Sequence, residues 1–116
     1  IELNREIAEV ILTETGFLVE TAPDGTDAVD MVRKSEENYY DAVLMDVQMP
    51  IMNGYEATRT IRNLPRKDVR DLPIIAMTAN ALEEDKEAAL KNGMNAHIAK
   101  PLDVDIFIQV LGHYLK

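Results

Sequence analysis

The 116-residue sequence contains no cysteine and no tryptophan, and it is short of basic residues. Without cysteine it can form neither a disulfide nor a metal site built on thiolates. Its net charge of −9 disfavours direct binding to nucleic acid, because surfaces that bind nucleic acid are basic. No apolar run reaches the roughly 18 residues needed to cross a membrane, and no signal peptide is visible. We therefore expect one cytoplasmic domain over residues 1–116, with no membrane contact of its own.

Apolar residues make up 47% of the sequence, which is enough to fill the core of one domain of this size. Their periodicity predicts alternating helices and strands. The predicted helices span 2–15, 26–36, 54–63, 82–92 and a last segment that begins after Asp103; the predicted strands span 17–21, 41–47, 73–78 and 96–99. The charged stretch 66–71 is expected to be a loop, and Val10 and Ile106 are expected to face inward. Strict alternation with short connections predicts an α/β fold, a doubly wound parallel sheet with helices on both faces.

Residues 42–54 are the most informative stretch of the sequence. An apolar run ends there in a single carboxylate, Asp46, and turn residues follow at Pro50 and Asn53-Gly54. The run is typical of a buried parallel strand, and ligands bind at the carboxyl ends of such strands. By itself Asp46 could equally be a solvated residue leaving the sheet, or the N-cap of the next helix.

Two later strands also end in polar residues, Thr78 and Lys100. The carboxyl ends of parallel strands share one edge of the sheet, so an acid, a hydroxyl and an ammonium should meet there. An Asp carboxylate can attack phosphorus, while Lys and Thr can stabilise the charge on phosphoryl oxygens. Separately, Thr78 could be a helix-capping hydroxyl and Lys100 a solvated strand end. Together the three residues predict a site for a phosphoryl group.

Three motifs of the chain resemble those of the receiver domains of two-component response regulators: residues 46–54, 76–79 and 97–101. The resemblance covers the whole chain and implies a flavodoxin-like fold with strand order 2-1-3-4-5. It implies that Asp46 is the phosphoacceptor, Thr78 the switch hydroxyl and Lys100 the phosphate-binding cation. It also implies Mg²⁺, held by Asp46 and by the backbone carbonyl of Gln48, and a cis peptide at Lys100-Pro101.

His97 stands where this family more usually has a switch Tyr or Phe; it could also be an ordinary edge-strand histidine. The sequence of residues 93–101 resembles that of receivers fused to hybrid sensor kinases. The partner implied is a histidine kinase or a histidine phosphotransfer domain. Phosphorylation would then change the shape of the face built from residues 82–112.

The sequence departs from the family pattern at its beginning. Receiver domains start with a central strand that ends in a Mg²⁺-binding acidic pair, and the first residues here resemble those just after that pair. We expect the strand to lie outside these residues, to have been cleaved, or to come from another chain. Its loss would cost on the order of 10 kcal/mol of burial. The isolated chain should therefore be unstable or oligomeric, for instance through strand exchange.

Three other functions compete with that of a non-enzymatic phosphoacceptor. A phosphatase of the haloacid-dehalogenase type would need a second acid two residues after the nucleophile, where Gln48 stands. A receiver-like module that binds partners without phosphorylation is favoured by the missing acidic pair, but Asp46, Thr78 and Lys100 argue against it. A flavodoxin-type binder would need a Gly/Ser/Thr-rich phosphate loop, which the sequence lacks.

Overall fold

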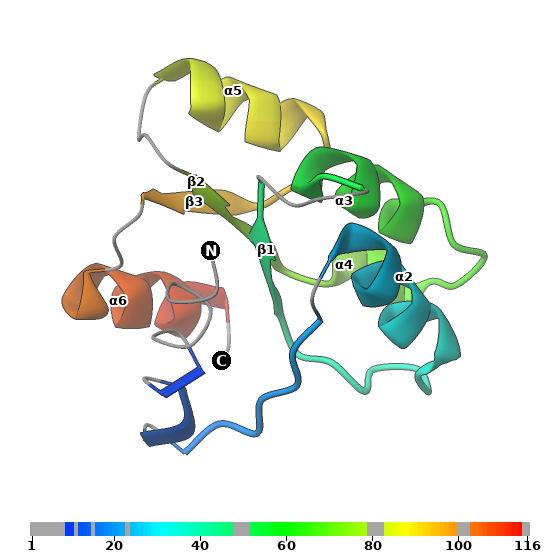
Figure 1. Cartoon of the computed structure of the whole chain (residues 1–116), viewed down its shortest axis with the longest axis horizontal. Coiled ribbons are helices and arrows are strands. Elements are labelled where there is room, and N and C mark those ends of the chain that lie inside the picture. Colours follow the sequence, from blue (N-terminus) through cyan, green and yellow to red (C-terminus); the bar gives the residue numbers. More distant parts are fainter. Residues whose placement is uncertain are drawn as a thin grey trace.

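Three parallel strands form the centre of the fold in a computed structural model of the chain (Figure 1). The structure describes residues 9–10, 12–14, 16–22, 24–47, 52–78, 83–99 and 103–114. The strands are β1 (Val43–Asp46), β2 (Ile74–Thr78) and β3 (Ala96–Ala99), and they lie in the order β1-β2-β3. This order confirms the 3-4-5 part of the predicted strand order, which the predicted strands 41–47, 73–78 and 96–99 form.

Helices cover both faces of this sheet. The described helices are α2 (Gly25–Lys34), α3 (Gly54–Arg62), α4 (Asp68–Asp71), α5 (Glu83–Lys91) and α6 (Val104–Tyr114). Figure 1 shows α2 and α3 on one side of the strands and α6 on the other. Residues 9–10 and 12–14 are also helical, in agreement with the predicted first helix.

Two separate cores hold these layers together, and β2 contributes to both. Side chains of a strand point alternately to its two faces. Accordingly, Ile74 and Ala76 belong to the larger core under α2 and α3, whereas Ile75 belongs to the smaller core under α6. All five residues of β2 are buried, which explains its continuous apolar sequence.

Side-chain caps begin the helices where the sequence has short polar residues. Asp24 accepts a hydrogen bond from the backbone N–H of Asp27 at 2.9 Å at the start of α2. Asp103 accepts one from the N–H of Asp105 at 3.0 Å, which confirms it as the predicted cap of the last helix. Such bonds satisfy N–H groups that have no partner within the helix.

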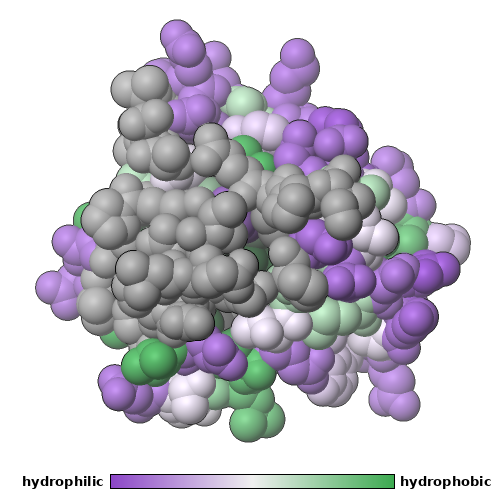
Figure 2. All heavy atoms as spheres, viewed as in Figure 1, coloured by the Kyte–Doolittle hydropathy of each residue, from purple (hydrophilic) through white to green (hydrophobic). Residues whose placement is uncertain are grey.

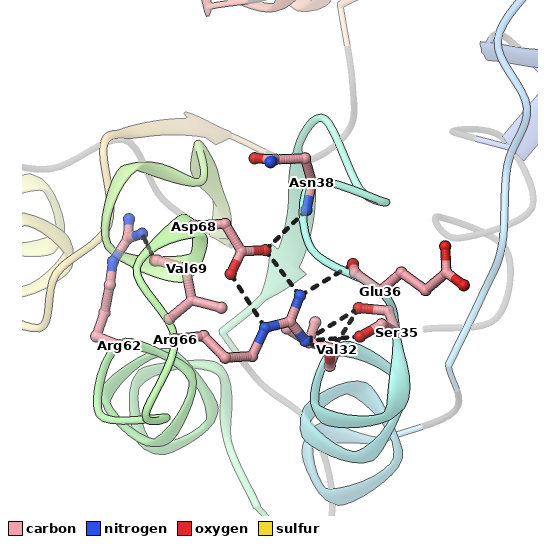
Figure 3. A network of polar contacts seen from close by, with 8 residues as sticks. All are labelled: Val32, Ser35, Glu36, Asn38, Arg62, Arg66, Asp68 and Val69. Atoms are coloured by element: carbon pink, nitrogen blue, oxygen red, sulfur yellow. Dashed lines mark hydrogen bonds and ion pairs between the residues drawn. The ribbon is translucent and has the colours of Figure 1, made fainter.

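An arginine joins the end of α2 to α4 on the periphery of the larger core. The guanidinium of Arg66 donates to the carbonyl oxygens of Val32, Ser35 and Glu36 at 2.6–2.9 Å (Figure 3). It also pairs with the Asp68 carboxylate at 2.7 Å, with both side chains largely shielded from solvent. The helix ending at Lys34 is thus fixed to the connection between α3 and β2.

The predicted strand 17–21 is wrong, because the described residues show no strand there. Residues 17–22 run without strand pairing, and Leu18 is fully exposed. In the predicted order this segment would pair only with the first strand, which is not found among the described residues. The segment is held instead by Glu20, whose carboxylate accepts hydrogen bonds from Tyr39 and, at 2.7 Å, from Tyr40.

Three smaller expectations are also corrected. Within the stretch 66–71 expected to be a loop, residues Asp68–Asp71 form the one-turn helix α4, which buries Val69. Val10 and Ile106, expected to face inward, are 54% and 51% exposed. In α6, Phe107 and Leu111 fill the core, and Ile106 lies beside this buried face.

The surface is largely polar over the described residues. Among the residues coloured by hydropathy in Figure 2, most visible side chains are hydrophilic, and apolar side chains emerge in small, separate groups. None of the described helices combines the length and the apolar character that a membrane span requires.

Candidate functional site

Asp46 is the last residue of β1 and lies at the carboxyl edge of the sheet. It stands opposite Met77 in the parallel pairing of β1 with β2. The next residue, Val47, continues the ladder by donating its N–H to the carbonyl of Met77 at 3.1 Å. The half-buried Asp46 therefore sits on a strand end that is held on the β2 side.

Thr78 ends β2 on the same edge and is 4% exposed. It pairs with Ala99, the last residue of β3. The structure thus brings Asp46 and Thr78 to adjacent strand ends, which confirms their predicted placement. Lys100 follows Ala99 directly and lies outside the described residues, as do Gln48, Pro50 and Pro101.

The first turn of α3 packs directly against the end of β1, and Gly54 makes this approach possible. A Cβ atom at Gly54 would lie 2.4 Å from the carbonyl oxygen of Asp46, a distance at which atoms clash. The Gly54 N–H donates to the carbonyl of Val47 at 3.1 Å. The chain therefore returns to within contact of Asp46 after the intervening loop.

A capping box fixes the start of α3 and settles one of the alternatives for Asp46. Asn53 accepts from the N–H of Glu56 at 2.9 Å, and the Glu56 carboxylate accepts from the N–H of Asn53. Because Asn53 is the cap of this helix, Asp46 is not. Sequence analysis missed this pair, although Asn-x-x-Glu before an apolar stretch is its signal.

His97 lies on β3, opposite Ala76, and is half-buried. It is on the strand that leads to Lys100, as predicted. In the parallel pairing of β2 with β3, His97 stands two residues before Ala99, the partner of Thr78. In the first turn of α3, burial and the charge of Asp85 raise the pKa of Tyr55. One carboxylate of α5 therefore acts on the first turn of α3.

The site offers a carboxylate of the type that Mg²⁺ prefers, but the described residues do not complete a metal site. Mg²⁺ takes about six oxygen ligands, several of them usually water. No group of three or more His, Cys, Asp or Glu side chains suited to a metal occurs in the described part of the chain. Asp46 fits as one ligand, and the predicted carbonyl of Gln48 lies outside that part.

This arrangement is chemically suited to an anionic group. A carboxylate and a hydroxyl at neighbouring strand ends can act as nucleophile and hydrogen-bond donor toward one phosphoryl group. The carboxyl edge of a parallel sheet is also the usual place for such ligands.

Known proteins similar to this chain point to signalling. Sensor histidine kinase RcsC of Escherichia coli is 40% identical over 114 residues, which cover 98% of this chain and 11% of that protein. Hybrid signal transduction histidine kinase I of Dictyostelium discoideum is 37% identical over 111 residues, or 94% of this chain and 6% of that protein. The chain thus spans about a tenth or less of the length of these curated relatives.

A solved structure of similar shape is the receiver domain of a sensor histidine kinase from Pseudomonas aeruginosa, described with a magnesium ion coordinated in its active-site cleft. It is 37% identical, with a TM-score of 0.86 over 99% of this chain and 90% of that one. A sequence model of the response regulator receiver domain matches residues 1–111. These likenesses place the chain with receiver domains rather than with phosphatases or flavodoxins. The chain belongs to the response regulator receiver domain family.

Proposed function

We propose that this receiver domain accepts a phosphoryl group on Asp46 from a histidine kinase or a histidine phosphotransfer domain. The main support is the strand register, which sets Asp46 beside the buried end of β2 that carries Thr78. The relatives, which are hybrid and sensor histidine kinases, support the choice of donor.

In the proposed transfer a carboxylate oxygen of Asp46 forms a bond to phosphorus. The bond between phosphorus and a histidine nitrogen of the donor breaks, and its electron pair stays on the imidazole. The product is an acyl phosphate. Thr78 donates a hydrogen bond to one phosphoryl oxygen, and Lys100 neutralises part of the charge.

Magnesium is the cofactor proposed for this step, as in the Pseudomonas aeruginosa receiver domain. Asp46 and the backbone carbonyl of Gln48 would hold the ion, which would supply charge neutralisation on the transferred oxygens. The remaining acidic ligands would come from outside the described residues.

The proposed output is a change in the face formed by residues 82–112. Phosphorylation adds about −1.5 to −2 charges at Asp46. Thr78 would follow the new oxygens, and His97 would take up the space that Thr78 leaves. The receiver would then shift between two populations with different surfaces for a protein partner.

Mass spectrometry of the protein as expressed from its natural gene, after incubation with acetyl phosphate and Mg²⁺, tests the proposal. The expected result is the addition of one phosphoryl group to the wild type and none to Asp46→Asn. Withholding Mg²⁺ should slow the addition. Equal labelling of both proteins would refute Asp46 as the acceptor, and no labelling of either would favour a module that works without phosphorylation.

A further inference from the structure

Arg62, the last residue of α3, spreads its guanidinium over the backbone of two loops. Its Nε and Nη2 donate to the carbonyl of Gly93 at 2.9 and 2.7 Å. Its Nη1 donates to the carbonyls of Val69 and Leu72 at 2.6 and 2.7 Å. One side chain thus joins α3 to the connection before β2 and to the turn between α5 and β3.

Asn95 extends this link to the first residue of β2. Arg62 donates from Nη2 to the Asn95 side-chain oxygen at 2.9 Å, and the same oxygen accepts from the N–H of Ile74 at 2.8 Å. The N–H of Asn95 donates back to the carbonyl of Ile74 at 2.8 Å. The turn after α5 is therefore fixed to both α3 and the sheet.

The end of α5 itself is closed by local bonds that Arg62 reinforces. Met94 donates its N–H to the carbonyl of Ala89 at 2.9 Å, while Gly93 adopts a φ of 98°. A second arginine of α3, Arg59, donates to the side-chain oxygen of Asn92. Together these contacts define an anchor, made of Arg59 and Arg62 with residues 92–95.

The other end of α5 is the more exposed one. Ala89, near the anchor, is the one buried side chain of this helix, at 1% exposure. Residues 83–88 are exposed or half-buried. This first part of the helix carries three carboxylates, Glu83, Glu84 and Asp85, and follows Thr78 after a short connection. Among the described residues, the hydrogen bonds that tie α5 to other elements are therefore gathered at its distal end.

We propose that the Arg62 anchor is the pivot about which α5 turns when Asp46 is phosphorylated. The inference rests on the proposed function and adds a positioning role for Arg62, which lies at the far end of α3 from Gly54. When Thr78 moves, the first turn of α5 moves with it. Because the anchor holds the other end of the helix, α5 rotates about the anchor. Hinges of this kind are usually formed by residues at the ends of elements.

Arg66 provides a matched control for Arg62. Its guanidinium is as richly bonded, to carbonyls at the end of α2 and to Asp68, but none of its described contacts reaches α5 or β3 (Figure 3). Arg66→Met should therefore destabilise the domain without changing how α5 responds to the site.

Hydrogen exchange with and without acetyl phosphate and Mg²⁺ tests the pivot in the protein as expressed from its natural gene. In the wild type, phosphorylation should change exchange at residues 83–87 and leave residues 92–95 unchanged. In Arg62→Met the change at 83–87 should shrink by about fivefold, the lower end of usual allosteric coupling, and 92–95 should begin to respond. Arg66→Met should keep the wild-type pattern.

Two results would overturn the inference: a wild-type pattern in Arg62→Met, or a wild-type response that is equal at both ends of α5. If Arg62→Met does not fold, Arg62→Lys keeps the charge but loses the planar fork of donors, and should show the same loss in part. Wild-type protein that takes up no phosphoryl group refutes the proposed function itself, and this inference with it.

Discussion

At the scale of single residues, the approach of α3 to the end of β1 depends on the lack of a side chain at Gly54. The atom that a Cβ would meet is the Asp46 carbonyl oxygen, which belongs to the backbone and cannot rotate away. The glycine therefore links the geometry of Asp46 to the start of a helix.

Gly54→Ala should lower the free energy of unfolding by about 2 kcal/mol or more, because α3 or the end of β1 must shift. It should also slow phosphorylation of Asp46. Gly112→Ala is the control: nothing lies within 4 Å of the added methyl group inside α6, so stability should rise by about 0.5–1 kcal/mol. Urea denaturation measures both, and equal effects would contradict the close-approach argument.

At the scale of elements, residues 17–22 show how a segment can be held without sheet pairing. Glu20 accepts hydrogen bonds from both Tyr39 and Tyr40, and these bonds lower the pKa of its carboxyl group. Burial and the bond to Glu20 raise the pKa of Tyr40 from 10.0 to about 12. The folded state therefore holds the Tyr40 proton more tightly than the unfolded chain. This stabilisation is complete below about pH 10 and is lost as the pH rises through about 12.

Glu20→Gln should lower the pKa of Tyr40 toward its ordinary value, but only part of the way, because burial is the larger cause. Nuclear magnetic resonance of the tyrosine rings during a pH titration measures the shift. Tyr55 serves as an internal reference, since its raised pKa comes from burial and Asp85. An unchanged Tyr40 would show that Glu20 does not hold this segment in solution.

The elements also show what the sequence could predict. Periodicity and turn residues located β1, β2, β3 and four of the five named helices. The strand predicted at 17–21 failed because a local pattern reports propensity, not whether a neighbouring strand is available. The helical turn α4 escaped prediction because a four-residue segment with three charged residues carries too little periodicity, and its support comes from distant bonds such as those of Arg66.

The site was predictable for a different reason. Spacing alone placed Asp46 and Thr78 at adjacent ends of parallel strands, because the sequence interval between them matches one strand–helix unit. The capping box at Asn53 is local and could have been read from the Asn-x-x-Glu spacing. The anchor at Arg62 depends on tertiary contacts to residues 69, 72, 93 and 95, which no spacing rule reveals. The roles of Lys100 and Gln48 stay predictions, since both lie outside the described residues.

At the scale of the whole molecule, the sheet separates two cores of unequal size. Among the described residues, the buried members of the smaller one, under α6, are Ile75, Ile98, Phe107 and Leu111, with several half-buried neighbours. Phe107 is the largest of these side chains and is completely buried. It should therefore decide whether α6 stays docked.

Phe107→Ala should therefore reduce the free energy of unfolding by about 3–5 kcal/mol, the usual cost of emptying a buried aromatic site. Its neighbour Ile106 is 51% exposed, so Ile106→Ala should change stability by only about 0.5 kcal/mol or less. Urea denaturation of both variants checks the difference. A large loss in Ile106→Ala would mean that α6 packs in another rotation.

The arginine between α2 and α4 has a practical consequence for protein engineering. The charged connection after α3 resembles a surface loop that would accept a fluorescent reporter or an affinity tag. Yet Arg66 binds it to the end of α2, and Arg62 donates hydrogen bonds to the carbonyl oxygens of Val69 and Leu72. An insertion there would break the bonds to both α2 and α3, so fusions belong elsewhere on the molecule.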